Sequence, residues 1–299
     1  MINEIIRQVP QWANAKEVAV APIDGLTNSN YLVTVDGERF VARIARKNSA
    51  LLGINRIEEL ATLQAAAALG IGAEVVHYRL PEGHLITRFI AGQHWTPEEY
   101  QKPESLRRIV ETVNRLHTST PVTATFSPFR RVESFANTAQ LHGVPFPPDY
   151  ADFMARMRDI EVNQQADPSP WLGFCHNDLF GVNFLDDGNI RIIDWEFAGM
   201  GDIYYDLATL VYAYDSVGPL PPELEEYLLE CYFGKVNQSH RLRLAQMKFM
   251  ALLFTAMWGL LQQAMLLGRI IDKVEWFDFL EYAEETFTSI RQLRPWLAS

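Results

Sequence analysis

The chain has 299 residues, of which 48% are hydrophobic and 21% charged, so it is long enough for one large domain or two lobes and has an ordinary globular composition. Its formal net charge of −11 argues against a nucleic acid or an anionic membrane as partner, because both require a basic surface. Its two cysteines, Cys175 and Cys231, are too few for a disulfide framework or a zinc-binding pattern, which predicts a reducing, cytoplasmic location.

The first part of the chain predicts β-strands joined by short polar turns. Residues 18–35 read as strand interrupted by a loop at 24–30, and Asp36-Gly37 predicts a two-residue turn into the strand "ERFVARIA". The loop can fold over phosphates with its backbone N–H groups, although a plain hairpin loop has the same composition. The short side chains that could join those N–H groups belong to Asn28, Ser29 and Asn30.

One charged side chain interrupts the otherwise apolar strand "FVARIA". Arg43 must either point to solvent or have a partner, because an unpaired charge on an inward face is costly. The next helix starts with Asn55 and Glu58 in a capping-box pattern, which accounts for Glu58. Glu59 shares a helix face with Leu63 and can point inward, so we predict an ion pair between Glu59 and Arg43.

A change of pattern near residue 92 predicts two lobes. Residues 73–92 read as two antiparallel strands around the turn "PEG", followed by a break at Gly92, after which helical periodicity prevails. The expected fold is therefore α+β, with a β-rich lobe over residues 1–91 and a helical lobe over 92–299. Within the second lobe, residues 121–148 are rich in Pro, Thr and Phe and predict an irregular insertion.

The stretch from Phe249 to Gly268 is uncharged for 20 residues, which is long enough to cross a membrane. Its interior contains Thr255, Gln262 and Gln263, and no second span accompanies it. These observations favour a buried helix of the helical lobe over a membrane span.

The segment from Phe174 to Phe197, "FCHNDLFGVNFLDDGNIRIIDWEF", holds the strongest motif. Its first turn has the spacing H-x-D-x-x-x-x-N of a kinase catalytic loop, and an acid follows "RII" on its second turn. Asp187-Gly188 predicts a hairpin that brings the two turns together. Each half alone could be an ordinary solvated turn, but both occur in order. The candidate catalytic residues are His176, Asp178, Asn183 and Asp194.

This spacing suits phosphoryl transfer from ATP, which needs a proton acceptor beside the attacking hydroxyl and oxygen ligands for Mg²⁺. Asp178 can accept the hydroxyl proton. Asn183 and Asp194 can offer oxygen atoms to the metal, and Glu196 is a further candidate ligand on the second turn.

At these residues the chain resembles the choline/ethanolamine kinase and aminoglycoside phosphotransferase superfamily, which has a bilobal protein-kinase-like fold. The resemblance implies that ATP and Mg²⁺ bind between the lobes and that Arg43 contacts phosphate where protein kinases carry a lysine. It also implies that Asp206, which by itself reads as a helix N-cap, braces the catalytic loop. The residues that match the adenine-binding hinge are Thr87, Arg88, Phe89 and Ile90.

The acceptor of the phosphate is less clearly marked. Trp258 and Tyr282 match aromatic positions that surround a quaternary ammonium in choline kinases, although core packing would also explain both. Thr255 stands where the eukaryotic enzymes carry another tryptophan, and an acid expected near Ala213 is missing. The resemblance implies a kinase for a small and cationic alcohol, with choline first. The alternatives are ethanolamine, thiamine or an aminoglycoside as acceptor, or a catalytically silent pseudokinase.

Overall fold

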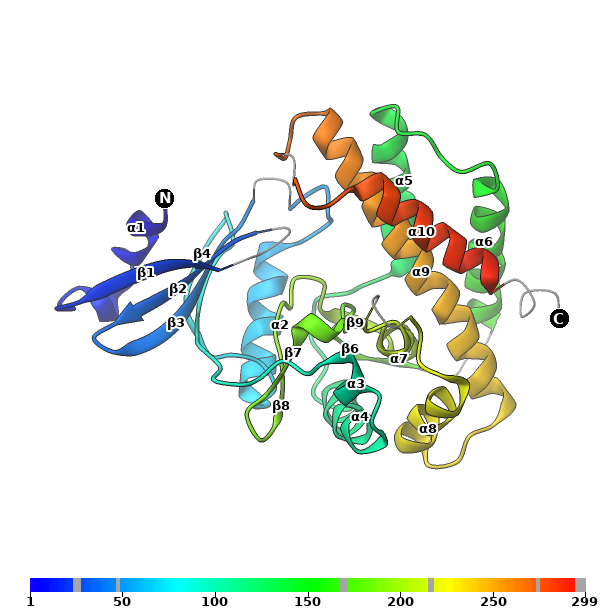
Figure 1. Cartoon of the computed structure of the whole chain (residues 1–299), viewed down its shortest axis with the longest axis horizontal. Coiled ribbons are helices and arrows are strands. Elements are labelled where there is room, and N and C mark those ends of the chain that lie inside the picture. The colour runs from blue at the N-terminus through cyan, green and yellow to red at the C-terminus, as the bar shows by residue number, and fades with distance from the viewer. Residues whose placement is uncertain (24–27, 47–48, 167–170, 215–217, 273–274, 294–299) are drawn as a thin grey trace.

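A computed structural model describes residues 1–23, 28–46, 49–166, 171–214, 218–272 and 275–293. The chain forms two lobes, one built on a sheet and one built of helices (Figure 1). The sheet lobe contains α1 (Ile2–Ile6), η1 (Pro10–Trp12), β1 (Val18–Ile23), β2 (Ser29–Val35), β3 (Glu38–Ile44), α2 (Arg56–Ala68), β4 (Val75–Arg79) and β5 (His84–Arg88).

The five strands form one antiparallel sheet in the order β1-β2-β3-β5-β4. The turn from β2 to β3 uses Asp36 at φ 47° and Gly37 at φ 88°, as the predicted two-residue turn requires. Phe40, Ala42 and Ile44 of β3 belong to the cluster that packs against α1 and η1. Because side chains alternate along a strand, Arg43 projects from the opposite face of the sheet.

The helical lobe contains α3 (Pro97–Tyr100), α4 (Pro103–His117), α5 (Pro128–Leu141), α6 (Tyr150–Ala166), α7 (Ile203–Val211), α8 (Pro222–Phe233), α9 (Gln238–Leu267) and α10 (Phe279–Gln292). Two short antiparallel strand pairs carry the motif segment: β6 (Leu172–Cys175) with β9 (Gly199–Asp202), and β7 (Phe184–Asp186) with β8 (Ile190–Ile192). A β-bridge between Gln93 and Asp186 places the chain in this lobe soon after β5 ends.

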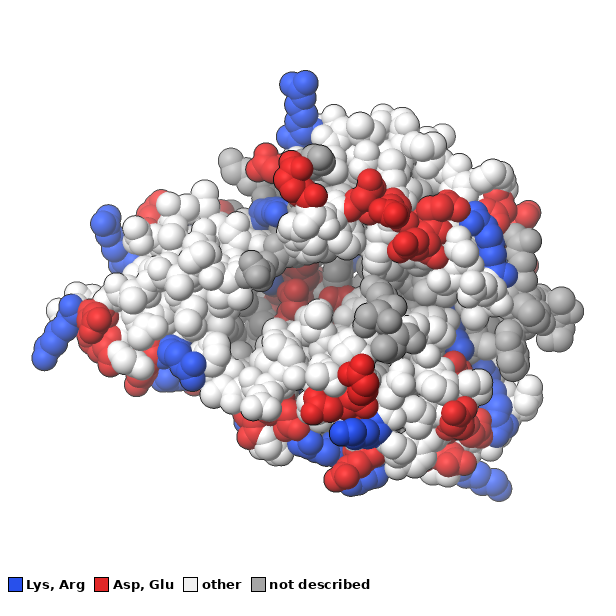
Figure 2. All heavy atoms as spheres, in the orientation of Figure 1, with Lys and Arg blue, Asp and Glu red and all other residues white. Residues whose placement is uncertain are grey.

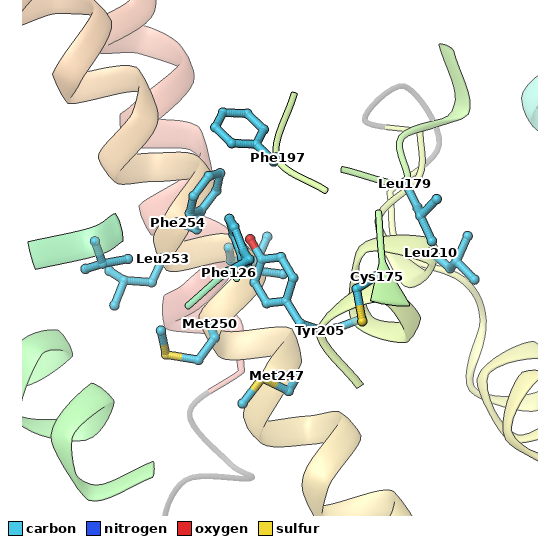
Figure 3. Close-up of a cluster of buried hydrophobic side chains, with 14 of the residues drawn as sticks. Phe126, Cys175, Leu179, Phe197, Tyr205, Leu210, Met247, Met250, Leu253 and Phe254 are labelled. Atoms are coloured by element: carbon cyan, nitrogen blue, oxygen red, sulfur yellow. The ribbon is translucent and has the colours of Figure 1, made fainter. Parts of the chain in front are cut away.

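Helix α9 forms the centre of the helical core. Among the described helices, α9 is the one that is long and apolar enough to cross a membrane. However, 72% of its most apolar window is buried inside the protein. Figure 3 shows Met247, Met250, Leu253 and Phe254 of this helix among buried side chains from other elements, including Phe126. The uncharged stretch is therefore a buried helix of this lobe, as predicted.

The expected irregular insertion at residues 121–148 is wrong, because this segment contains the helix α5. Ser127 caps its N-terminus by accepting a hydrogen bond from the N–H of Arg130 (3.4 Å). Pro128 occupies the first helical position, where a missing N–H costs nothing. The helix buries an apolar face with helical spacing against α9, formed by Phe129, Val132, Phe135, Ala136 and Ala139.

Candidate active site

The catalytic loop begins directly after β6, and the buried carboxylate of Asp206 holds its backbone in place. Asp206 is fully buried and accepts hydrogen bonds from the backbone N–H groups of His176 (2.8 Å) and Asn177 (2.6 Å). Asn177 adopts φ 66°, a left-handed conformation that asparagine tolerates better than most residues. This geometry matches the bracing role that the resemblance implied for Asp206.

The alternative reading of Asp206 as a helix N-cap is wrong. Helix α7 begins at Ile203, and its cap is Asp202, whose side chain accepts from the N–H of Tyr204 (3.0 Å). Asp206 lies in the first turn, and its carboxylate also meets Nε2 of His117 at 2.9 Å. A carboxylate accepts, so Nε2 donates to it, and Nδ1 forms a hydrogen bond with the Tyr232 hydroxyl at 2.8 Å.

His176 connects the two turns of the motif rather than facing a substrate. Its Nε2 donates to the backbone carbonyl of Ile193 (3.0 Å), and its ring meets Trp195 edge-on at 4.7 Å between centroids. Burial lowers the pKa of His176, because the charged form loses its hydration. The side chain is fully buried, so the expected catalytic role is corrected to a positioning one.

The predicted hairpin from β7 to β8 brings the second turn beside the first. The N–H of Ile193 donates to the carbonyl of Asn183 (3.0 Å), which places Asp194 next to Asn183. The Asn183 side-chain amide donates to the backbone carbonyl (2.8 Å) and to Oδ2 (3.2 Å) of Asp178. Its amide oxygen therefore remains available as an acceptor, which is what a hard metal ion requires.

Arg43 connects the sheet lobe to these turns. It forms the predicted ion pair with Glu59, and its Nη2 also donates to the carbonyl of Gly83 (3.3 Å). Its Nη1 lies 3.7 Å from Oδ1 of Asp194 and 3.8 Å from Oε2 of Glu196. One guanidinium thus joins an acid of its own lobe to two acids of the other lobe.

Two partners of Glu59 were not predicted. Arg56 donates to Oε2 of Glu59 (2.6 Å) and lies 3.8 Å from Glu196, and the Tyr78 hydroxyl also donates to Oε2 of Glu59 (2.6 Å). The spacing of Arg56 and Glu59, three residues apart on a helix, was an available signal for the first contact. Burial alone would raise the pKa of Glu59, but the two arginines and the hydrogen bonds outweigh burial and lower it.

Three carboxylates gather where the metal ligands were expected. Burial and the charges of Asp194 and Glu196 raise the pKa of Asp178 well above its usual range. Burial and the charge of Asp194 raise the pKa of Glu196 to about 7, despite the nearby arginine Arg43. Figure 2 shows Asp and Glu atoms inside the hollow between the lobes. A divalent cation would relieve this mutual repulsion, so Asn183, Asp194 and Glu196 fit a magnesium site.

The phosphate-binding loop and the hinge are described in part. Residues 24–27 of the loop lie outside the described residues, whereas Asn30 pairs with Arg43 across β2 and β3 and so faces the same side of the sheet. Asn28 is buried and Ser29 begins β2. The described end of the loop therefore lies next to Arg43, on the same face of the sheet.

In the expected hinge, most backbone donors already have partners. Thr87 lies in the sheet between β3 and β4. The N–H groups of Arg88 and Phe89 donate to backbone carbonyls elsewhere in the sheet lobe at 2.9 and 3.1 Å. The side chain of Arg88 is exposed and forms ion pairs with Glu38 and Glu74 on the surface. Of the four predicted residues, Ile90 therefore remains the candidate whose N–H could meet adenine.

A cavity of about 480 Å³ opens beside Asp178, between α7, α9 and α10. Aromatic side chains from these helices and from the adjoining loops form part of its wall. They are Phe180, Tyr205, Tyr212, Tyr214, Phe254, Phe277 and Tyr282. Cavities of this size and character usually hold small molecules.

Of the two aromatic residues predicted for this pocket, Tyr282 lines it and Trp258 does not. Trp258 packs edge-on against Tyr282, with ring centroids 6.2 Å apart, and against Phe279 at 5.8 Å. It therefore supports the wall of the cavity from behind. Thr255, one turn earlier on α9, does reach the cavity.

Comparison with known proteins agrees with this geometry. Residues 19–244 match the family model of the phosphotransferase enzyme family. The protein LicA of Haemophilus influenzae is 26% identical over 242 residues, which cover 78% of this chain and 68% of that protein. A probable choline kinase of Arabidopsis thaliana, choline kinase 3, is 24% identical, with 97% of this chain and 91% of that protein covered.

A solved structure from Mesorhizobium loti, a choline/ethanolamine kinase family protein, superposes with a TM-score of 0.80 and 28% sequence identity. The match covers 99% of this chain and 97% of that chain. The fold is thus the protein-kinase-like one expected from the motif segment. Since the family model spans more than half of the sequence, this chain belongs to the phosphotransferase enzyme family.

Proposed function

We propose that this protein is an ATP- and Mg²⁺-dependent kinase that phosphorylates the hydroxyl group of a small cationic alcohol, with choline as the first candidate. The observation that carries the proposal is the position of Asp178. Its carboxylate belongs both to the acidic cluster that suits Mg²⁺ and to the wall of the aromatic cavity. An acceptor in that cavity would present its hydroxyl to Asp178 beside the bound phosphates.

Each residue of the site would have a separate role in the reaction. Asn183, Asp194 and Glu196 would hold the metal, which when bound neutralises charge on the phosphate oxygens. Arg43, held by Glu59, would bind phosphate with its planar guanidinium. Asp178 accepts the hydroxyl proton as the acceptor oxygen bonds to the γ-phosphorus and the bond to the ADP oxygen breaks.

The choice of choline rests on the cavity together with the relatives. Aromatic faces attract a quaternary ammonium group through cation–π interaction, worth about 0.5–2 kcal/mol for each well-placed ring. The relatives named above include a probable choline kinase and a member of the choline/ethanolamine kinase family. Ethanolamine, thiamine and an aminoglycoside remain the alternative acceptors, and a pseudokinase is the alternative without catalysis.

The test is an ATP-consumption screen with Mg²⁺ over choline, ethanolamine, thiamine, homoserine and kanamycin, with the products identified by mass spectrometry. We expect choline to give the highest kcat/KM and phosphocholine as product. Asp178→Asn should lower the turnover about 10²-fold or more, whereas Asp187→Asn at the tip of the β7–β8 hairpin should not. Preference for thiamine or kanamycin would overturn the choline assignment, and no turnover with any acceptor would overturn the kinase assignment.

A further inference from the structure

The acceptor cavity has an uneven distribution of charge. Among the described residues that line it, the ionisable acids are Asp178 and Glu285, and none is Lys, Arg or His. Asp178 lies at the reaction end, on the catalytic loop. Glu285 lines the cavity from a different element, α10. The cavity therefore presents one carboxylate from the catalytic loop and a second one from α10.

Helix geometry explains why Glu285 faces the cavity. The α10 residues on its wall include Tyr282, Glu285, Thr286 and Ser289, which are three or four positions apart and so form one stripe of the helix. Glu281 and Glu284 do not line the cavity. Figure 2 shows acidic side chains along α10 beside the hollow.

The carboxylate of Glu285 is available for a ligand. Within the described part of the chain, no nitrogen atom of a Lys, Arg or His side chain lies within 4.0 Å of the Glu285 carboxylate oxygens, the distance that defines an ion pair. Its neighbour Glu284, by contrast, accepts from Nη1 of Arg291 at 2.7 Å. An accessible carboxylate without a cationic partner, on the wall of an aromatic cavity, is suited to a cationic ligand group.

The wall near Ala213 lacks the acid that the family resemblance led us to expect. Ala213 is buried, and its carbonyl accepts from the N–H of Gly181 at 2.7 Å. No carboxylate can reach the cavity from that position. Glu285 offers one from a different element, so the negative charge of the pocket has a different origin in this chain.

We propose that Glu285 is the counter-charge for the cationic head of the acceptor and determines the preference for charged over neutral alcohols. This proposal rests on the proposed function for the identity of the reaction, and it assigns recognition of the positive charge to α10. In the bound acceptor, the hydroxyl meets Asp178 while the ammonium group lies among the aromatic rings, with Glu285 beside it.

The test compares two alcohols of the same shape and different charge. One is choline, and the other is dimethylbutanol, in which a carbon atom replaces the choline nitrogen. Glu285→Gln should raise the KM for choline about 2- to 5-fold, the range for a partly solvated ion pair, with little change in kcat. The KM for dimethylbutanol should not rise, because this alcohol has no charge to lose a partner.

The matched control is Glu281→Gln, one turn earlier on α10 and outside the cavity wall, which makes the same change in net charge. It should leave both KM values unchanged. Equal effects of the two variants would mean that only the overall field matters, and a parallel shift for both alcohols would mean that the shape of the pocket has changed. Either result, or an unchanged KM for choline, overturns the proposal.

A binding measurement separates this proposal from the proposed function. Calorimetric titration with tetramethylammonium requires neither ATP nor turnover, and Glu285→Gln should weaken this binding by the same 2- to 5-fold. If the protein phosphorylates neither alcohol but binds tetramethylammonium through Glu285, the proposed function fails and the cation site remains. Equal affinities in wild type and variant, or no binding to wild type, overturn the cation site itself.

Discussion

Replacing Glu59 with glutamine tests the buried ion-pair cluster that connects the sheet to α2. The Glu59 side chain is 1% exposed and serves Arg43, Arg56 and the Tyr78 hydroxyl together. Glutamine fills the same volume, but it leaves two buried guanidinium groups without their main counter-charge. Breaking a buried ion pair from one side costs about 3–5 kcal/mol.

The expected loss lies at the lower end of that range. Glu196 lies 3.8 Å from each of the two arginines and compensates part of the lost charge. We therefore expect Glu59→Gln to lower the free energy of unfolding by about 3 kcal/mol. Glu58→Gln, the neighbouring substitution at a less buried side chain, should cost less than about 0.5 kcal/mol.

The effect also has a defined pH dependence. The pKa of Glu59 is lowered in the folded protein, so the ion pair contributes fully above the pKa of an unfolded glutamate, about 4.3, and its contribution is lost as the pH falls through the folded-state value. The difference between wild type and Glu59→Gln should thus shrink as the pH falls below about 4.3, and the titration of Glu196, whose pKa is raised to about 7, should add a separate change near neutral pH.

The measurement is urea unfolding, followed by circular dichroism and by tryptophan fluorescence, in EDTA and without nucleotide. These conditions keep metal and ATP binding from contributing to stability. If Glu59→Gln and Glu58→Gln lose the same stability, the cluster does not support the fold as argued. A difference that grows as the pH falls below about 4.3 would show that the sign of the pKa shift of Glu59 is wrong.

Three further predictions concern the catalytic loop, the metal and the cavity wall. Asp178→Ala should lower kcat about 10²-fold or more with little change in ATP affinity, and steady-state kinetics within a few fold of wild type would refute this. Asp194→Ala should remove the Mg²⁺ dependence of ATP binding, which a magnesium-titrated calorimetric measurement would detect; an unchanged dependence would exclude Asp194 as a ligand. Trp258→Ala should raise the KM for choline about 10-fold by loosening Tyr282, and leave the KM for ATP unchanged. An unchanged choline KM would mean that Trp258 serves only the core.

The features that the sequence predicted well depend on short stretches of chain. The two turns of the motif lie about ten residues apart, and the hairpin between them follows from Asp187-Gly188 alone. The pairing of Arg43 with Glu59 was predictable because a buried charge requires a partner and Glu59 shares a helix face with Leu63. In each case one or two local rules were enough.

The features that escaped prediction depend on packing between distant elements. Arg56 follows a helix cap and reads as a surface residue, yet the turn at Gly83 covers it, so closely that a β-carbon there would lie 2.3 Å from its Cδ. The position of Trp258 behind Tyr282 depends on how α9 packs against α10. The role of Glu285 depends on the same packing, because the sequence of α10 does not state which of its faces meets a cavity.

The origin of the two ends of the cavity has a consequence for how such an enzyme can change in evolution. The reacting groups belong to the catalytic loop, which Asp206 holds in place. Helix α10, which lies much later in the sequence, supplies part of the wall around the acceptor. Substitutions along the stripe of α10 that lines the cavity can therefore alter which alcohol is accepted without changing the residues that carry out phosphoryl transfer. The choice of acceptor and the rate of phosphoryl transfer can therefore change independently. A library of variants with substitutions confined to α10 is a direct way to search for new acceptors.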